Sequence, residues 1–219
     1  MTYLVLFDID GTLLLTHDEV YVEANRDALR AVWGIAPDGP DRPGDTATAH
    51  TRRALRTAGI DDADIEAHLD EWCAAFSARY IELLASADTS HWRTPSEAAD
   101  VIAQIPNRAL LTGNPEPVAR ARMERVGLGK LFARGTGAFG CEREDRVALF
   151  ELARSRAGDQ PTEVTVGVGD TPLDVSSAHA AGALSIAVTT GAYKAEQLRD
   201  ADAVISALAE LPPALAALI

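Results

Sequence analysis

Apolar residues gather in four short runs along the chain, and these runs do not alternate with polar residues. They span residues 3–7, 108–111, 164–168 and 183–188 and are rich in Val, Leu and Ile. Such runs are typical of strands in a parallel sheet that helices cover on both faces. A turn and then a helical pattern follow each run. We therefore expect an α/β fold with a Rossmann-like, doubly wound parallel sheet.

Signals at helix ends support this order of elements. Asn114 and Thr171 each precede a proline, as expected of an N-cap residue followed by proline at the first helical position. Gly182 stands where the helix after Pro172 is expected to end. Ligands of such sheets bind at the carboxyl ends of the strands, so polar residues at those ends are the first candidates for a site.

The stretch between His17 and His91 has a helical pattern throughout and contains no strand-like run. Helices are expected near residues 19–33, 45–58 and 63–84, with a loop at 38–44 that is rich in Gly, Pro and Asp. We predict a core domain of residues 1–15 and 92–219 and an inserted helical cap domain of residues 16–91. Where the chain returns to the core, the TPSE sequence of residues 94–97 has the pattern of a capping box.

Two carboxylates follow the first predicted strand, in the sequence FDIDGTLL. Asp8 comes directly after the strand, and Asp10 follows two residues later. Gly11 would help the backbone to coil so that both carboxylates reach one site. The alternative is a polar turn that happens to contain Asp-Gly.

Two further strand ends carry polar residues. Thr112 and Gly113 lie between a strand and a helix, where backbone N–H groups and a hydroxyl suit phosphate oxygens, although such residues are also common in turns and caps. Asp170 ends another strand and Asp174 lies one helical turn later, so both can bind a hard cation. Thr171 to Asp174 can equally be a capping box, but that would leave Asp170 unexplained.

The three motifs DIDGTLL, LLTGN and GDTPLD together resemble those of the haloacid dehalogenase superfamily, and they occur in the same order. The chain is most similar to the phosphoglycolate phosphatase and β-phosphoglucomutase-like members, whose helical cap lies where the insertion lies here. The resemblance covers nearly the whole chain. It implies a magnesium-dependent phosphatase that hydrolyses a small phosphorylated metabolite through a phospho-aspartate intermediate.

The resemblance also implies roles for individual residues. Asp8 would be the nucleophile and Asp10 the general acid/base, which must be protonated at the start of the reaction. Magnesium would be bound by the side chains of Asp8 and Asp170 and the backbone carbonyl of Asp10, with Asp174 supporting the metal site. The phosphate would be held by a second set of residues, namely Gly11, Thr112, Gly113 and a cation.

That cation is a departure from the family pattern. Most members place a lysine before the GD motif, whereas the lysines of this chain are Lys130 and Lys194, in other contexts. Arg146 lies near the spacing that the family uses, so we assign it to this role, although arginine is not equivalent to lysine. The alternative is a solvated arginine beside Glu142 and Glu144.

The cap is expected to decide the substrate. Four residues in or after its polar loop can contact the leaving group, or can equally be surface or helix-cap residues: Arg42, Asp45, Thr46 and His50. His17 and His91 flank the insertion at expected hinge positions, and we assign neither a catalytic role.

Composition restricts the partners and the location. The net charge is −13, from 33 acidic and 20 basic residues, and such a surface repels nucleic acid and anionic membranes but not a small phosphate ester in a local pocket. The N-terminus lacks the features of a signal peptide, and no apolar run is long enough to span a membrane. Cys73 and Cys141 form no CxxC pair and are expected to be reduced, as in a cytoplasmic protein.

Three other functions remain to be weighed. A phosphomutase of the same family would return the phosphate to the sugar, and Asp10 is common to both reactions. A dehalogenase is disfavoured because those relatives lack an acid/base Asp at this position. A binding module without turnover would have lost the nucleophile or a metal ligand, and only the arginine in place of lysine supports it.

Overall fold

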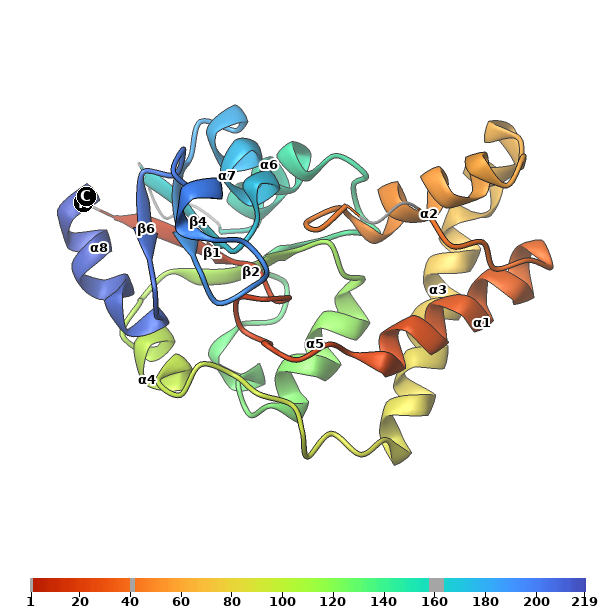
Figure 1. Cartoon of the computed structure of the whole chain (residues 1–219), viewed down its shortest axis with the longest axis horizontal. Coiled ribbons are helices and arrows are strands. Elements are labelled where there is room, and N and C mark those ends of the chain that lie inside the picture. The colour runs from red at the N-terminus through yellow and green to blue at the C-terminus, as the bar shows by residue number, and fades with distance from the viewer. Residues whose placement is uncertain (1, 40–41, 158–163) are drawn as a thin grey trace.

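The structure, a computed structural model, describes residues 2–39, 42–157 and 164–219. Its centre is a six-stranded sheet in the order β3-β2-β1-β4-β5-β6, and all neighbouring strands are parallel (Figure 1). The strands are β1 (Tyr3–Phe7), β2 (Arg108–Thr112), β3 (Ala138–Phe139), β4 (Val164–Gly169), β5 (Leu184–Val188) and β6 (Ala203–Ile205). The predicted α/β sheet and its four long strands are confirmed, whereas the short edge strands β3 and β6 were not predicted.

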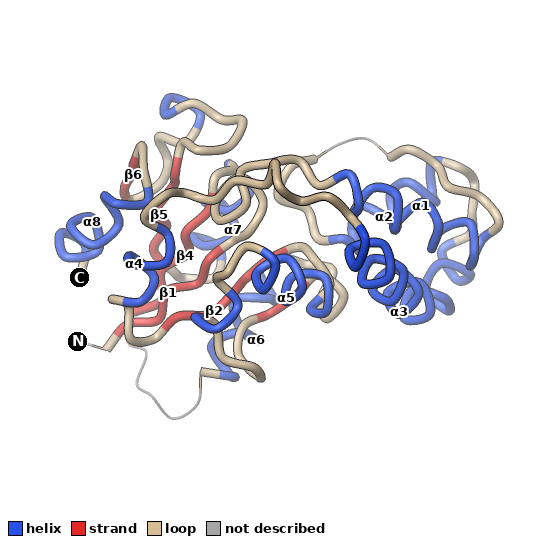
Figure 2. The backbone as a smooth tube through the Cα atoms, turned by 90° about the horizontal axis from the view of Figure 1, so that it is seen from below, coloured by secondary structure: helices blue, strands red, loops and turns tan. Residues whose placement is uncertain are grey.

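Helices cover both faces of this sheet (Figure 2). They are α4 (Ala98–Ala103), α5 (Glu116–Arg125), α6 (Arg146–Arg156), α7 (Pro172–Ala180) and α8 (Leu211–Leu218). Alternate residues of β1 face opposite layers: Leu4 and Leu6 pack with residues of α6 and α7, while Val5 and Phe7 pack with residues of α4, α5 and α8. Burial on both faces explains why the strand is apolar without alternation.

Of the four described helices between β1 and β2, we call the first three the cap helices. They are α1 (Glu19–Trp33), α2 (Ala47–Thr57) and α3 (Asp62–Ser86), close to the predicted ranges. They lie beside the sheet, to the right in Figure 1. Their core contains the buried Trp72, Phe76 and Tyr80 of α3, and Tyr21 of α1 lies with its ring centre 4.9 Å from that of Phe76. The domain boundaries at residues 15/16 and 91/92 stay a prediction. The predicted loop at 38–44 has no helix or strand where it is described, and residues 40 and 41 lie outside the described residues.

The helix-end predictions had different outcomes. Thr171 is the N-cap of α7 and forms a capping box with Asp174, and Gly182 follows the end of that helix with φ 65°. The prediction for Asn114 was wrong, because Pro115 is the N-cap of α5 and the Asn114 side chain contacts neighbouring polar groups instead. The capping box at 94–97 was also wrong. There α4 begins at Ala98, its N-cap makes no side-chain cap bond, and a turn precedes it.

The prediction of reduced cysteines was wrong as well. Cys73 of α3 and Cys141, which follows β3, form a disulfide with their Cα atoms 6.2 Å apart. The two residues are separated by 68 positions, so their sequence context did not reveal that they are neighbours in space. The bond joins a cap helix to a loop of the sheet layer.

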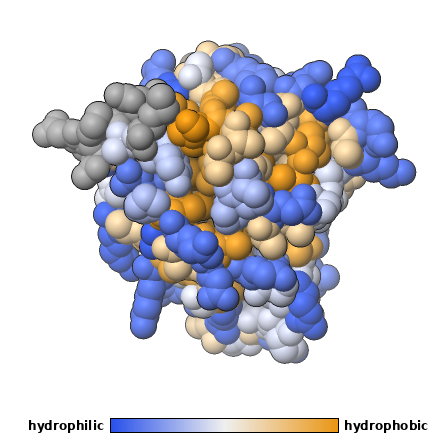
Figure 3. Space-filling view, turned by 90° about the vertical axis from the view of Figure 1, so that its left-hand side faces the viewer, coloured by the Kyte–Doolittle hydropathy of each residue, from blue (hydrophilic) through white to orange (hydrophobic). Residues whose placement is uncertain are grey.

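The outer surface is mixed in polarity. On the face away from the cap helices, hydrophilic residues surround smaller groups of hydrophobic ones (Figure 3). Among the described residues, no helix combines the length and the apolar character needed to cross a bilayer.

Candidate active site

A cavity of about 780 Å³ is lined both by the carboxyl ends of the strands and by the cap helices. Seven of the eight predicted site residues line it: Asp8, Asp10, Gly11, Thr112, Gly113, Arg146 and Asp170. The eighth, Asp174, is not part of the lining and contacts the guanidinium of Arg146. The structure thus brings the three sequence motifs together, while the chemical role of each residue stays a prediction.

The backbone after β1 brings the first motif against the third. Asp8 continues the strand pairing, because its N–H donates to the Val168 carbonyl at 2.9 Å. The chain then turns, with φ 75° at Gly11, and the Gly11 N–H donates to the Leu14 carbonyl. A Cβ atom on Gly11 would lie 2.3 Å from Asp170 Oδ2. Glycine is therefore required both by the backbone angle and by the close approach of this carboxylate.

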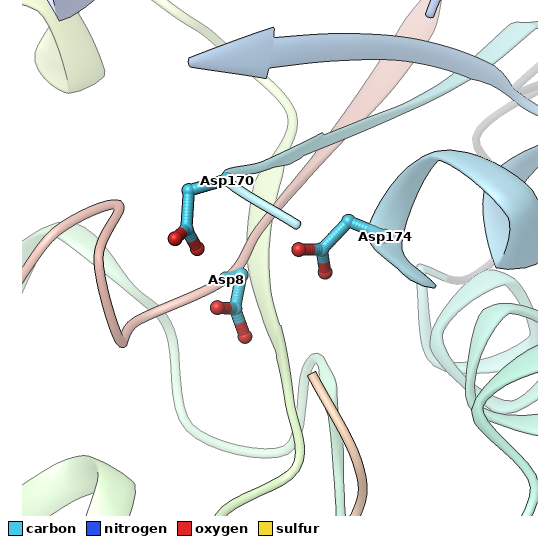
Figure 4. A group of neighbouring side chains, drawn as sticks. All are labelled: Asp8, Asp170 and Asp174. Carbon is cyan, nitrogen blue, oxygen red and sulfur yellow. The ribbon is translucent and has the colours of Figure 1, made fainter. Parts of the chain in front are cut away.

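Three carboxylates form a buried cluster at this point. One oxygen of each of Asp8, Asp170 and Asp174 lies within 4.8 Å of the other two, and the Asp174 carboxylate points toward the side on which Asp8 and Asp170 lie (Figure 4). Asp8 follows β1, Asp170 follows β4, and Asp174 lies in the first turn of α7. In the part of the chain that the structure describes, the buried Asp170 Oδ1 has no hydrogen-bond partner.

Burial and mutual repulsion disfavour the ionisation of all three carboxyl groups at once. Burial raises the pKa of Asp170 to about 7, and the nearby Asp174 and Asp10 act in the same direction. Burial also raises the pKa of Asp8 well above its usual range; Arg146 opposes this, and the neighbouring carboxylates add to it. Without another positive charge nearby, Asp8 and Asp170 therefore bind protons more tightly than exposed aspartates do.

Arg146, the first residue of α6, is a buried cation in contact with the cluster. Its Nη2 donates to Asp8 Oδ1 at 3.0 Å and also to Asp174 Oδ1, and its Nη1 donates to the Gly44 carbonyl at 2.7 Å. Arg146 is 5% exposed, so the alternative of a solvated arginine was wrong.

The two glutamates near Arg146 in sequence form ion pairs with other arginines. Glu142 pairs with Arg156 and Glu144 with Arg52. The remaining candidate cations are exposed and do not line the cavity, namely Lys130, Arg143 and Lys194.

Asp10 lies at the edge of the cluster in a different environment. Its side chain is 57% exposed, and its Oδ2 accepts hydrogen bonds from Asn114 Nδ2 at 2.8 Å and Arg122 Nη1 at 3.0 Å. Its position in the cavity removes part of its hydration and so raises the pKa of Asp10, but the charge of Arg122 and these hydrogen bonds outweigh this effect and hold the pKa below its usual range. In the free protein these contacts favour the charged form of Asp10, and its protonation at the start of the reaction stays a prediction.

The second motif contacts the cap helices as well as the cavity. Thr112 Oγ1 accepts a hydrogen bond from Asn114 Nδ2 at 2.8 Å. The Gly113 carbonyl accepts from the Ala47 N–H at 2.8 Å, and a Cβ on Gly113 would lie 2.2 Å from the Asp45 carbonyl oxygen. Glycine here permits the start of α2 to approach the loop that is predicted to hold phosphate.

The predicted specificity residues of the cap also face this region. The cavity lining includes all four of them, namely Arg42, Asp45, Thr46 and His50. Thr46 is in addition the N-cap of α2 and donates to the Glu144 carbonyl at 2.7 Å, and Asp45 pairs with Arg53. Contact with a leaving group stays a prediction for each of them.

Sequence reasoning missed three residues that organise the site. Asn114 was interpreted as a helix cap, Arg122 belongs to a helix outside every motif, and a Cβ on Gly191 would lie 1.7 Å from Asp170 Oδ2. One signal was available for Arg122. It lies four residues after the buried Val118, and therefore on the buried face of α5.

The donors present suit a hard divalent cation. They are all oxygens, and Arg146 is the cation among the described side chains that contacts the cluster. Both oxygens of Asp174 already accept hydrogen bonds, Oδ2 from Thr171 and Oδ1 from Arg146, whereas Arg146 contacts Asp8 through Oδ1. Asp8 and Asp170 are therefore the carboxylates most available to a metal. The unpartnered Asp170 Oδ1 and the raised pKa values are what such a site is expected to show without its ion.

Comparison with protein families now adds to this geometry. Residues 3–182 match the model of the haloacid dehalogenase-like hydrolases. The chain belongs to this family. It is 32% identical to a phosphoglycolate phosphatase of Chromobacterium violaceum, over 94% of this chain and 93% of that protein. It is also 27% identical to a phosphoglycolate phosphatase of Agrobacterium fabrum, over 97% and 91% of the two chains.

Solved structures share the fold of this haloacid dehalogenase-like hydrolase. CbbY of Rhodobacter sphaeroides, in complex with phosphate, superposes with a TM-score of 0.67 at 22% identity, over 96% of each chain. A putative β-phosphoglucomutase of Bacteroides vulgatus gives a TM-score of 0.65 at 19% identity, over 99% of this chain and 90% of the other. At these identities the likeness supports the fold and not a particular reaction.

Proposed function

We propose that this hydrolase is a magnesium-dependent phosphatase that releases phosphate from a small phosphorylated metabolite, with Asp8 as its nucleophile. The observation that carries the proposal is the buried Asp8 carboxylate. It lines the cavity, contacts Arg146 and lies close to the carboxylates of Asp170 and Asp174. The names of the curated relatives support phosphomonoester hydrolysis and make phosphoglycolate the first substrate to test.

In the proposed reaction a carboxylate oxygen of Asp8 attacks phosphorus, and the bond from phosphorus to the leaving oxygen breaks. Asp10 gives its proton to that oxygen, which leaves as an alcohol. Water then attacks the phosphoryl group on Asp8, Asp10 takes a proton from the water, and phosphate leaves with Asp8 regenerated. The pKa of Asp10 is lowered in the free protein. The negative charge of the arriving phosphate must therefore raise this pKa, so that Asp10 carries a proton when the reaction starts.

The other residues would hold the phosphoryl group and limit charge repulsion. Magnesium, when bound, neutralises charge between a carboxylate nucleophile and the phosphate, and its ligands would be Asp8, Asp170 and the Asp10 carbonyl. Asp174, oriented by Thr171, would support that site. The phosphate oxygens would be bound by a separate group, namely Gly11, Thr112, Gly113 and Arg146.

The test is phosphate release by the purified protein, with magnesium, from a panel of small phosphate esters that includes phosphoglycolate. Asp8→Asn should lower the rate by at least about a thousandfold and leave the fold intact, because the amide has nearly the same shape but is no nucleophile. Asp200→Asn, at a side chain that is 87% exposed, is the matched control and should keep the wild-type rate.

Two results would contradict the proposal. Near-normal phosphate release by Asp8→Asn would remove the assigned nucleophile. Isomerised sugar phosphate without free phosphate would instead favour the phosphomutase, which uses the same two aspartates.

A further inference from the structure

Arg122 is a buried cation that none of the sequence motifs contains. It lies on α5 with its side chain 2% exposed. Its Nε donates to Asp18 Oδ2 at 2.8 Å, and its Nη1 donates to Asp10 Oδ2 at 3.0 Å and to Asn114 Oδ1 at 3.1 Å. A buried guanidinium requires such partners, and two of the three are carboxylates.

One of these carboxylates belongs to the cap helices. Asp18 is the N-cap of α1, where its Oδ1 accepts from the Tyr21 N–H at 3.2 Å. Its Oδ2 also accepts from the hydroxyl of Tyr80 on α3, at 2.7 Å. The Arg122 guanidinium lies 5.1 Å from the centre of the Tyr21 ring. Arg122 therefore contacts Tyr21 of α1 directly and is linked to Tyr80 of α3 through Asp18.

The other carboxylate is that of Asp10, which is held in place by side chains from outside its own loop. Its side chain is 57% exposed on a loop beyond the strand, and the side-chain partners that the structure gives it are Asn114 and Arg122, both held by the α5 segment. Asn114 in turn accepts from Arg122, so the same guanidinium contacts Asp10 directly and through its second partner.

We propose that Arg122 is a positioning residue for proton transfer by Asp10. It holds this carboxylate at the cavity, and through Asp18 and Tyr80 it makes that position depend on the packing of the cap helices. The inference rests on the proposed phosphatase reaction and adds to it a residue that acts only through Asp10.

The dependence of the rate on the leaving group tests this role. An alkyl phosphate leaves as an alkoxide and needs the proton, whereas p-nitrophenyl phosphate leaves as a stable phenolate and hardly needs it. Arg122→Lys keeps a positive charge but cannot span Asp10 and Asp18 with one planar fork. The readout is kcat/KM, because it reports the transfer to Asp8 and not the later hydrolysis, in which Asp10 acts for both esters. We expect kcat/KM for the alkyl ester to fall by about a hundredfold, with kcat/KM for the aryl ester changed less than about threefold.

Two variants control for general damage to the helix or the core. Arg120→Lys, two residues earlier on α5, alters a buried arginine that bonds the carbonyls of Phe132 and Thr136 and does not line the cavity. It should change the rates on both esters equally.

Tyr80→Phe removes the hydroxyl that donates to Asp18 and leaves Arg122 in place. It should therefore lower the rate on the alkyl ester selectively, by a few-fold. This variant keeps the test valid if Arg122→Lys folds poorly.

A second mutation at Asp10 completes the test. Arg122→Lys added to Asp10→Asn should lower the alkyl rate no further, because the two residues act as one unit. The inference would be overturned if Arg122→Lys and Tyr80→Phe each lowered the rates on both esters equally. It would also be overturned if Arg122→Lys lowered the alkyl rate of Asp10→Asn by its full factor. Neither result would contradict the proposed phosphatase function. A wild-type protein that releases phosphate from neither ester would overturn the proposed function, and this inference with it.

Discussion

Arg146 occupies a position where the geometry of the side chain matters as much as its charge. Its guanidinium contacts Asp8, Asp174 and the Gly44 carbonyl at once. A planar fork can make these contacts together, whereas a lysine ammonium presents one compact charge. The residue thereby joins the predicted nucleophile to the loop that leads into α2.

Substitution of Arg146 should consequently have a graded effect. Arg146→Ala should lower kcat/KM by at least about tenfold, because charge-assisted contacts to a transferring phosphoryl group are lost. Arg146→Lys should restore part of that loss. Arg143→Ala, at an exposed position three residues earlier, is the control and should change little. Steady-state kinetics measure this, with circular dichroism to verify folding; wild-type kinetics in Arg146→Ala would exclude its assigned role.

The raised pKa of Asp170 predicts that the stability of the metal-free protein depends on pH. Its pKa is about 7 in the folded chain and lower when unfolded, so the folded state binds the proton more tightly. The contribution of Asp170 to stability is therefore fully present below its unfolded pKa and is lost as the pH rises through about 7. Magnesium binding to the ionised cluster should oppose this loss, so its effect on Tm should be larger at about pH 8 than at about pH 5.

Thermal unfolding with magnesium and with EDTA measures this difference, and phosphatase activity should be lost in EDTA. In Asp170→Asn the magnesium-dependent rise in Tm should disappear at both pH values. Equal stabilisation of that variant and the wild type would place the metal elsewhere.

Most of the site residues found from sequence follow a recognisable strand, whereas Arg146 was found from the spacing that the family uses. Asp8 and Asp170 were predictable because the carboxyl ends of parallel strands meet at one edge. Asn114 and Arg122 were not assigned to the site, since their roles come from contacts more than a hundred residues away in sequence with Asp10. Local patterns carry no information about such pairs.

At the scale of elements, the length of an apolar run decided what could be predicted. The strands of five or six residues were found, whereas β3 has two residues and β6 has three. Strands this short bear no distinctive pattern, and they form because the neighbouring strand offers free backbone groups in register, as Leu111 does to Ala138. The long helices were found to within about two residues, which is the usual uncertainty of helix ends.

The capping box of α7 affects both the stability of this helix and the position of a side chain at the site. Thr171→Ala removes a cap and one donor to Asp174, so it should cost about 1 kcal/mol and also lower kcat, because Asp174 contacts Arg146. Asp61→Ala removes the exposed N-cap of α3 and is the matched control, with a similar cost but an unchanged kcat. Urea unfolding and initial rates separate the two effects. If both variants had the same kcat, the capping box would be structural alone.

At the scale of the whole molecule, the cap helices are fastened to the sheet layer at neighbouring points. Thr48 Oγ1 donates to the Gly140 carbonyl at 2.6 Å, and the Ala47 N–H donates to the Gly113 carbonyl at 2.8 Å. The disulfide at Cys141 lies one residue beyond Gly140, and it reaches α3 instead of α2. The start of α2 and the middle of α3 are thus both held against the same loop after β3, which also precedes Arg146.

The disulfide should therefore contribute measurably to global stability. It closes a segment of 68 residues between α3 and the loop after β3, and cross-links of this length usually stabilise by about 2–4 kcal/mol by restricting the unfolded chain. Urea unfolding of the wild type should shift to a lower midpoint when dithiothreitol is added. Cys73→Ser should unfold at that lower midpoint whether or not the reductant is present, because it has no bond to reduce. Thiol titration of the denatured wild-type protein without reductant should detect no free cysteine; two reactive thiols and a midpoint insensitive to dithiothreitol would show that the cap helices are held by non-covalent contacts alone.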